Sequence, residues 1–260
     1  MIGFCSLALR KLPIEDAIRQ ITESGFREIE VWYAHVQAKA DAELRDLARF
    51  AAERGAILTV LSPYFFFTRG EKAWNESLEN ARRVVHCAGL LGIPKVRTFV
   101  DAGPDGLAST NARPEHWDAA IRGLQALCAL DRSREFVVET HENTLADTLP
   151  CVQRLLDEVG EPNLKLNYQS NSDFLDRGFI PCLETLWPHV SHMHWQQAVA
   201  GQHEGYLEDP GLIDFSALAA LVTQKDYRGT ISVEYCWPDV DPARIRSAAA
   251  YLDGLFPGGW

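Results

Sequence analysis

Short apolar runs alternate along the chain with longer stretches in which apolar residues recur at helical spacing. The alternation repeats eight times, roughly every 30 residues. Each short run predicts a buried β-strand, and each longer stretch predicts an amphipathic helix. The predicted strands are Ile2–Cys5, Glu28–Trp32, Ile57–Leu61, Lys95–Phe99, Phe136–Glu139, Leu164–Asn167, Val190–His194 and Thr230–Glu234. The predicted helices cover 14–24, 43–54, 72–91, 114–130, 145–158, 173–187, 215–224 and 241–254.

Turn and capping residues support these boundaries. Glycines such as Gly160 and Gly229 follow helical patterns and precede strands, where a left-handed residue commonly ends a helix. Thr144 and Asp147 resemble an N-terminal capping pair in front of the fifth helix. The sequence therefore predicts where most of the helices begin and end.

Eight strand–helix repeats indicate an all-parallel sheet. A closed eight-stranded barrel accounts for that number in 260 residues, so we predict one α/β domain over residues 1–260, a single (β/α)8 TIM barrel. An open doubly wound sheet is the structural alternative, and it more often has a glycine-rich phosphate loop after its first strand. Here the first strand is followed by Ser6–Arg10, which contains no glycine. The helical pattern is weakest over 173–187, because Gly178 and Pro181 interrupt it.

The charge balance narrows the possible partners. The chain has 25 Lys and Arg against 36 Asp and Glu, a net charge of −11, which disfavours nucleic acid and anionic membranes as partners. No apolar run approaches the ~20 residues of a membrane span, and the N-terminal residues lack a signal-peptide pattern. The six cysteines are scattered without a C-x-x-C pair and are typical of reduced thiols. We therefore expect a cytoplasmic protein.

Polar residues mark the ends of the last four predicted strands. They are Glu139, Gln169, His194 and Glu234. In a TIM barrel the carboxyl ends of the strands form the functional face, and neighbouring strands lie about 4.8 Å apart. Two carboxylates and an imidazole suit Mn²⁺, Mg²⁺, Co²⁺ or Zn²⁺. Such a metal can polarise a carbonyl or enediolate oxygen while the carboxylates move a proton between adjacent carbons.

At these residues the chain resembles the xylose isomerase-like barrel superfamily of sugar isomerases, ketose epimerases, hydroxypyruvate isomerases, dehydratases and an apurinic endonuclease branch. The resemblance covers essentially the whole chain and is most specific in Val138–His141, Thr144–Thr148, His192–His194 and Ile231–Glu234. It implies that Glu139, Gln169, His194 and Glu234 hold the metal. It also implies that Glu139 and Glu234 are the catalytic acid/base pair.

Of three positions compared with the resembled family, two depart from its pattern. Gln169 stands where the ligand is usually Asp, Asn171 where many members have His or Asn, and Gln197 where an Asp is frequent. Glutamine can ligate through its carbonyl oxygen but brings no charge, so it weakens a divalent-metal site. The departures leave three interpretations: an active enzyme with an altered site, a weak metal binder, or a barrel that has lost catalysis.

Two histidines and an asparagine are secondary candidates for binding substrate. His192 shares strand parity with His194 but lies one layer further from the strand end, where a structural role competes with substrate contact. His141 lies in the loop just past Glu139, and either binds substrate or is an ordinary loop residue. Asn171 follows the sixth strand and is a further candidate.

Strands two to four offer weaker signals. A buried Arg97 needs a partner such as Glu30 or Glu139, and could equally bind an anionic group of the substrate. Four aromatic residues could form an apolar wall of the binding site or belong to ordinary packing: Trp32, Tyr64, Phe65 and Phe66.

The predicted function is a metal-dependent isomerase or epimerase of a sugar, keto-sugar or related polyol, acting by proton transfer between glutamates. The alternatives are a metal-assisted lyase or dehydratase, and a sugar-binding barrel without turnover. An abasic-site endonuclease is disfavoured, because the chain is acidic and the strand ends offer too few His and Asp ligands. The expected partner is a small carbohydrate-like molecule, and a homodimer is compatible with the resemblance.

Overall fold

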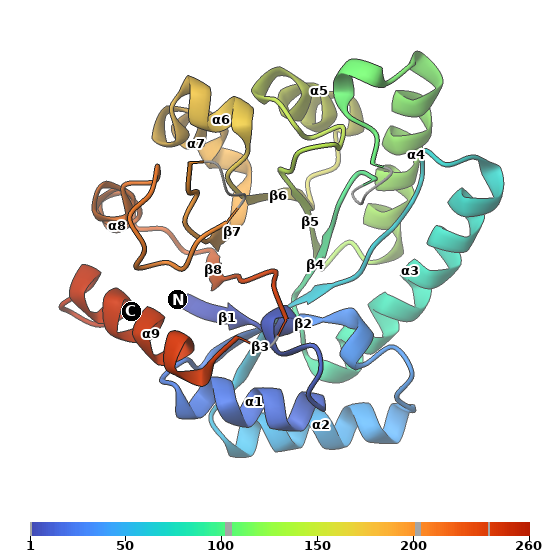
Figure 1. The fold of residues 1–260 in the computed structure, drawn as a ribbon. Helices are drawn as coiled ribbons and strands as arrows, with labels where there is room; N and C mark the ends of the chain where they lie inside the picture. Colours follow the sequence, from blue (N-terminus) through green and yellow to red (C-terminus); the bar gives the residue numbers. More distant parts are fainter. Residues whose placement is uncertain (1, 102–105, 201–203, 239) are drawn as a thin grey trace. The chain divides into compact units, whose positions relative to one another are not determined.

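The computed structural model describes residues 2–101, 106–200, 204–238 and 240–260. Eight parallel strands follow one another in chain order in a closed barrel (Figure 1). This topology confirms the predicted (β/α)8 TIM barrel. The strands are β1 (Ile2–Cys5), β2 (Glu28–Trp32), β3 (Ile57–Ser62), β4 (Lys95–Thr98), β5 (Glu135–Glu139), β6 (Leu164–Tyr168), β7 (Val190–Trp195) and β8 (Thr230–Val233).

Helices follow the strands in the order that the sequence predicts. They are α1 (Ile14–Glu23), α2 (Asp41–Glu53), α3 (Glu71–Leu91), α4 (Pro114–Leu130), α5 (Leu149–Val159), α6 (Ser172–Arg177), α7 (Phe179–Leu186), α8 (Phe215–Gln224) and α9 (Pro242–Leu255). Short 3-10 turns are η1 (Ser6–Leu9), η2 (Tyr33–His35), η3 (Ser109–Asn111) and η4 (Trp187–His189). Across the described residues, no helix combines the length and the apolar character needed to cross a membrane.

Two predicted helices differ from the structure. The stretch 173–187 is divided into α6 and α7, because Gly178 between them adopts a φ of 98° that breaks the helical path. The fifth helix begins at Leu149, and its N-cap is Thr148, whose side chain accepts a hydrogen bond from the Cys151 N–H. The predicted capping pair of Thr144 and Asp147 was therefore wrong.

The predicted glycine caps were correct at Gly160 and wrong at Gly229. Gly160 ends α5 in the left-handed conformation, with a φ of 64°. After α8 the left-handed residue is instead Asp226, with a φ of 50°. Aspartate tolerates this region better than most residues, so the turn does not require a glycine.

The chain divides into two compact units. The first unit contains Met1–Thr59 and Met193–Trp260, and the second contains Val60–His192. In the first unit β1 pairs with β2 on one side and with β8 on the other, in the registers Gly3↔Glu28 and Phe4↔Val233. Helices α1 and α2 of this unit lie side by side (Figure 1).

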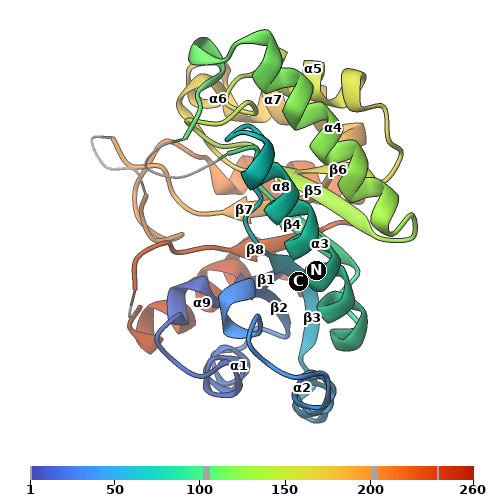
Figure 2. The ribbon, with the colours of Figure 1, turned by 90° about the vertical axis from the view of Figure 1, so that its right-hand side faces the viewer.

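The second unit is built around a continuous parallel ladder from the end of β3 to β6. Its registers include Val60↔Lys95, Val96↔Phe136 and Glu139↔Asn167. Helices α3 and α4 pack against each other beside this ladder (Figure 2). The last of these registers sets a strand-end glutamate next to a strand-end asparagine.

Burial on both faces explains the apolar character of the strands. Ile29 and Val31 of β2 are fully buried, as expected for a parallel strand covered by helices. Glu28 and Glu30 occupy the alternate positions of the same strand and are also buried. A strand that buries glutamates at alternate positions needs polar partners for them, and these partners define the candidate site.

Candidate functional site

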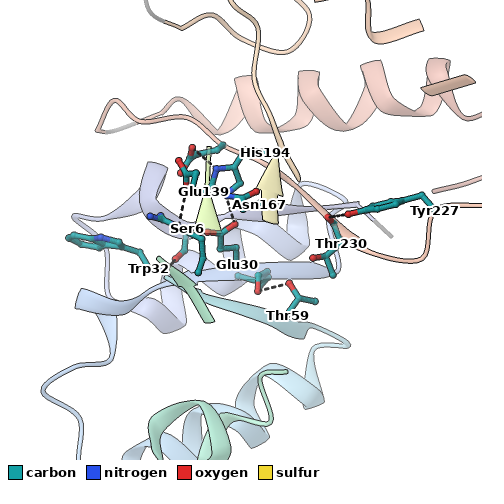
Figure 3. Close-up of polar contacts among 12 residues, drawn as sticks. Ser6, Glu30, Trp32, Thr59, Glu139, Asn167, His194, Tyr227 and Thr230 are labelled. Carbon is teal, nitrogen blue, oxygen red and sulfur yellow. Dashed lines mark hydrogen bonds and ion pairs between the residues drawn. The ribbon is translucent and has the colours of Figure 1, made fainter. Parts of the chain in front are cut away.

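In the first unit, the imidazole of His194 lies between two glutamates. Its Nε2 atom is 2.9 Å from Oε2 of Glu30 (Figure 3), and its Nδ1 atom is 3.0 Å from Oε2 of Glu234. The exposed side-chain fractions are 0% for His194 and Glu30 and 3% for Glu234. We call these three residues the histidine cluster.

Strand register brings the histidine cluster together. Glu30 is in β2, which pairs with β1 at Cys5↔Glu30. Glu234 directly follows β8, the strand on the other side of β1. The Glu234 N–H donates to the Trp195 carbonyl 3.2 Å away, next to His194. All three side chains are thus held by backbone that the sheet fixes.

The charges of the histidine cluster suit a cation. Two carboxyl side chains and one imidazole meet there, and all three are buried. Buried like charges are costly unless a proton or a metal ion is shared between them. Imidazole nitrogen and carboxylate oxygen are the donors that Zn²⁺ and Mn²⁺ accept in proteins. The donor set therefore fits a divalent metal.

In the second unit, Glu139 at the end of β5 has a permanent cation as its partner. The Arg97 Nε atom is 3.1 Å from Oε2 of Glu139. The Asn167 side-chain amide donates to the same oxygen over 3.1 Å (Figure 3). Glu139 is one of the two partners expected for Arg97. The Arg97 and Glu139 side chains are 1% and 2% exposed, so this is a buried ion pair. We call these three residues the arginine cluster.

Aromatic rings surround the guanidinium of Arg97. Its central carbon lies 5.5 Å from the ring centroid of Tyr64 and 4.6 Å from that of Phe99. Tyr64 stacks on Phe99 at 5.5 Å, and His141 meets the edge of Phe99 at 5.0 Å. Three predicted substrate-binding residues, Arg97, Tyr64 and His141, therefore gather around one phenylalanine.

Phe65 and Phe66 are packing residues. Phe65 is 1% exposed and packs on the Phe67 ring at 6.1 Å. The ring of Phe66 lies under the guanidinium of Arg69 at 4.3 Å. The sequence offered Tyr64, Phe65 and Phe66 as aromatic candidates in the second unit. Within the described part of the chain, the ring contacts bring only Tyr64 of these three to Arg97.

Gln169 is held near the end of β5 through its backbone. Its N–H donates to Thr140 Oγ1 over 2.8 Å, and Thr140 Oγ1 donates to the Gln169 carbonyl over 2.8 Å. Asn171 caps α6 by accepting a hydrogen bond from the Phe174 N–H over 2.9 Å. Asn171 thus has a structural task that the sequence did not indicate, and its Nδ2 atom is buried without a hydrogen bond to any described residue.

Gln197 stabilises the loop after β7. Its Oε1 atom accepts from the N–H groups of Ala198 and Ile213, at 3.1 and 2.9 Å. Its Nε2 atom donates to the carbonyls of Asp209 and Ile213, at 3.3 and 3.2 Å. The sequence led us to interpret Gln197 as a sign of a weakened metal site. These four bonds explain the residue by loop structure instead.

Trp32 and His192 are the remaining two residues that the sequence predicts to bind substrate. The half-buried Trp32 ring meets the edge of His35 at 5.4 Å, and its backbone N–H donates to Ser6 Oγ (Figure 3). His192 is fully buried in β7, two residues before His194. Substrate contact by either residue stays a prediction.

Sequence reasoning missed the roles of Glu30 and Asn167. Both are fully buried polar residues inside apolar strands. Glu30 was considered only as a partner of Arg97, whereas the structure pairs it with His194. The available signal was a second glutamate at the same strand parity as Glu28, which demanded a buried partner of its own.

Comparison with known proteins places the chain in a family. Residues 18–255 match the family described as Xylose isomerase-like TIM barrel. The chain is 28% identical to a 3-dehydroshikimate dehydratase of Bacillus anthracis over 209 residues, 75% of this chain and 70% of the relative. It is 25% identical to a putative hydroxypyruvate isomerase of Homo sapiens over 238 residues, 84% of this chain and 82% of the relative.

A solved structure agrees with this fold. A probable 3-DHS dehydratase from Bacillus anthracis superposes with a TM-score of 0.82 at 20% identity, covering 96% of this chain and 97% of that one. The chain belongs to the xylose isomerase-like TIM barrel family, and it is an enzyme of that family.

Proposed function

We propose that the protein is a metal-dependent isomerase or epimerase of a sugar, keto-sugar or related polyol. The observation that carries this proposal is the histidine cluster, in which an imidazole and two carboxyl groups meet in a buried place. Proton removal next to a carbonyl needs a fixed base and a means to stabilise the enolate that forms. Buried, oriented carboxylates beside a cation-binding donor set supply both.

The two strand-end glutamates are the proposed acid and base. Glu139 is oriented by Arg97 and Asn167, which both contact its Oε2 atom. Glu234 is positioned by its backbone bond to Trp195 and by His194. One glutamate takes the proton from the substrate carbon, and the other returns a proton to the same or the adjacent carbon.

The proposed metal ligands are Glu139, Gln169, His194 and Glu234. A bound Mn²⁺, Mg²⁺, Co²⁺ or Zn²⁺ would polarise the substrate carbonyl as a Lewis acid. The support is that all four residues lie at or near the carboxyl ends of β5 to β8, and functional groups of such barrels lie at that face.

The proposed substrate-binding residues in the second unit are Arg97, Tyr64 and His141, which gather around Phe99. A phenol, an imidazole and a guanidinium can bind hydroxyl and carbonyl oxygens of a polyol. Asn171, His192 and Trp32 are proposed as further substrate contacts. Each offers a hydrogen-bonding group or a ring. Trp32 ends β2, Asn171 follows β6, and His192 lies within β7.

Solvent deuterium exchange tests the proposal. Wild-type protein with added Mn²⁺ is incubated in D₂O with ketopentoses, ketohexoses and hydroxypyruvate, and deuterium at the carbon next to the carbonyl is measured by NMR. Glu139→Gln and Glu234→Gln should each abolish exchange. Glu135→Gln, on the same strand as Glu139 but half-buried beside Lys95, is the matched control and should retain it. Full exchange in both site variants would overturn the mechanism.

Dehydration is the second candidate, and the 28% identity to a 3-dehydroshikimate dehydratase favours it. The first step is the same proton removal, but the intermediate then expels a β-hydroxyl group as water. Mass spectrometry of the product separates the candidates, because an isomer conserves mass and a dehydration product lacks one water. 3-Dehydroshikimate is added to the substrate panel for this purpose.

A further inference from the structure

We propose that Glu30 is the positioning residue of His194: it holds Nε2–H of the imidazole and thereby directs the Nδ1 lone pair to a divalent metal shared with Glu234. This inference rests on the proposed metal-dependent function. It assigns a task to a buried glutamate that the acid/base chemistry does not use.

The geometry divides the two nitrogens of the imidazole between two tasks. Nε2 lies 2.9 Å from Glu30 and Nδ1 lies 3.0 Å from Glu234, so the ring is approached from opposite sides. A metal-bound imidazole has one nitrogen for the metal and an N–H on the other, commonly donated to a carboxylate. Of the two carboxylates, Glu234 is the proposed ligand at a strand end, which leaves Glu30 as the acceptor of the N–H.

The backbone of β2 fixes the position of Glu30, so that its carboxylate can hold the His194 imidazole in one orientation. It is the third residue of β2, a strand whose backbone is fixed by pairing with β1, and its side chain is fully buried. A carboxylate that accepts the Nε2–H fixes both the tautomer and the rotation of the ring. The distance from Nδ1 to the Glu234 carboxylate is then set before any metal arrives.

Metal affinity tests this role directly, without any need for substrate. Mn²⁺ titration by calorimetry would compare the wild type with Glu30→Ala, Glu30→Gln and Glu28→Ala. Glu28 is the matched control, because it is a buried glutamate two residues earlier at the same parity of the same strand. Loss of an outer hydrogen-bond partner of a metal-bound histidine typically weakens affinity by about 10- to 100-fold.

We expect Glu30→Ala to bind Mn²⁺ about 10- to 100-fold more weakly than the wild type. Glu30→Gln keeps an acceptor oxygen and should recover part of that loss. Glu28→Ala should bind as the wild type does. The visible absorption spectrum of bound Co²⁺ should change in Glu30→Ala and stay as in the wild type in Glu28→Ala, because it reports ligand geometry.

Several outcomes would overturn the inference. Wild-type binding together with unchanged affinity in Glu30→Ala would overturn the role of Glu30 and leave the proposed function standing. Equal losses in Glu30→Ala and Glu28→Ala would reduce the effect to general destabilisation. If Glu30→Ala does not fold, Glu30→Gln decides, and unweakened Mn²⁺ binding there overturns the inference. No Mn²⁺ binding by the wild type would instead overturn the proposed metal dependence, and this role with it.

Discussion

The two units each bury strand-end glutamates but neutralise them differently. In the arginine cluster, Glu139 faces a guanidinium that stays charged at all relevant pH values, and the pair is complete within the protein. In the histidine cluster, two glutamates contact the two ring nitrogens of one imidazole, and these are donor types that metal ions accept. The same residue type thus faces a guanidinium in one unit and an imidazole in the other.

Because of this difference, we expect substitutions in the two clusters to change different properties of the protein, stability in one case and metal affinity in the other. Removing one member of a complete buried ion pair leaves an uncompensated charge and costs stability. Removing one member of the histidine cluster takes away a proposed metal ligand or the residue proposed to position one. We therefore expect variants of the first kind to unfold more easily, and variants of the second kind to lose metal.

The largest expected effect on stability is that of Arg97→Met. It leaves Glu139 buried without its cation, and we expect the free energy of unfolding to fall by about 3–5 kcal/mol. Urea denaturation measures the loss. The double variant Arg97→Met/Glu139→Leu removes both charges and should recover much of it. Arg154→Met breaks the half-exposed pair with Glu158 and should cost below about 1 kcal/mol. Equal losses for Arg97→Met and Arg154→Met would contradict the contrast.

We expect a smaller loss in the free energy of unfolding for Gln197→Ala. This variant tests whether neutral hydrogen bonds stabilise the unit that contains the histidine cluster. The substitution leaves N–H and C=O groups of the loop after β7 without partners, and we expect a loss of about 2–3 kcal/mol in urea denaturation. Gln125→Ala is the control, because it removes a single side-chain bond to the Val159 carbonyl. A loss no larger than that of the control would remove the structural explanation for Gln197.

His35 offers an imidazole of the first unit to compare with His194. Both of its ring nitrogens are buried without a hydrogen bond to any described residue, and burial lowers its pKa to about 4. The unfolded chain therefore binds a proton that the folded protein rejects. The stability from His35 is fully present above pH 6.5 and is lost as the pH falls toward 4.

The measurement is the free energy of unfolding as a function of pH for the wild type and His35→Phe. Between pH 6.5 and 4, the free energy of unfolding should fall by about 2 kcal/mol less in His35→Phe than in the wild type. This value allows for solvent screening at a half-buried site. Identical slopes for the two proteins would show that burial of His35 does not contribute to acid sensitivity.

The smallest expected effect belongs to Gln169→Asp, which adds a carboxylate near the end of β6. The backbone bonds between Gln169 and Thr140 do not involve the substituted side chain, so the strand end should keep its position. We expect Mn²⁺ affinity to rise about tenfold, close to 1.4 kcal/mol. Unchanged affinity on calorimetric titration would remove Gln169 from the proposed ligand set, and a gain would retain it.

The sequence predicted the fold well because the barrel depends on patterns that are local. Strands such as β1 and β2 have their predicted ends, since continuous apolar runs bounded by turn residues specify parallel strands. Helix starts were less predictable. The cap of α5 is Thr148 rather than Thr144, because the loop before it uses Thr144 to bond the His141 carbonyl. Tertiary contacts of that kind leave no periodic signal.

The candidate site was only partly predictable for the same reason. Strand-end positions revealed Glu139, His194 and Glu234, but not which cation or acid each one faces. The contacts of Arg97 with Glu139 and of Glu30 with His194 depend on spatial proximity that no sequence spacing encodes. For Gln197 the residue type was misleading. A glutamine in place of the usual Asp suggested a weakened metal site, whereas its side chain forms hydrogen bonds that hold the loop after β7.

Mn²⁺ binding by the wild type, His194→Ala and His189→Ala tests the central claim most directly. His189 is exposed just before the same strand and controls for the loss of any histidine. The account predicts near-stoichiometric Mn²⁺ in the wild type and in His189→Ala. It predicts affinity at least about 100-fold weaker in His194→Ala, beyond the usual cost of losing an outer partner. A wild type that binds no Mn²⁺, or a His194→Ala variant that binds it equally well, would contradict the account.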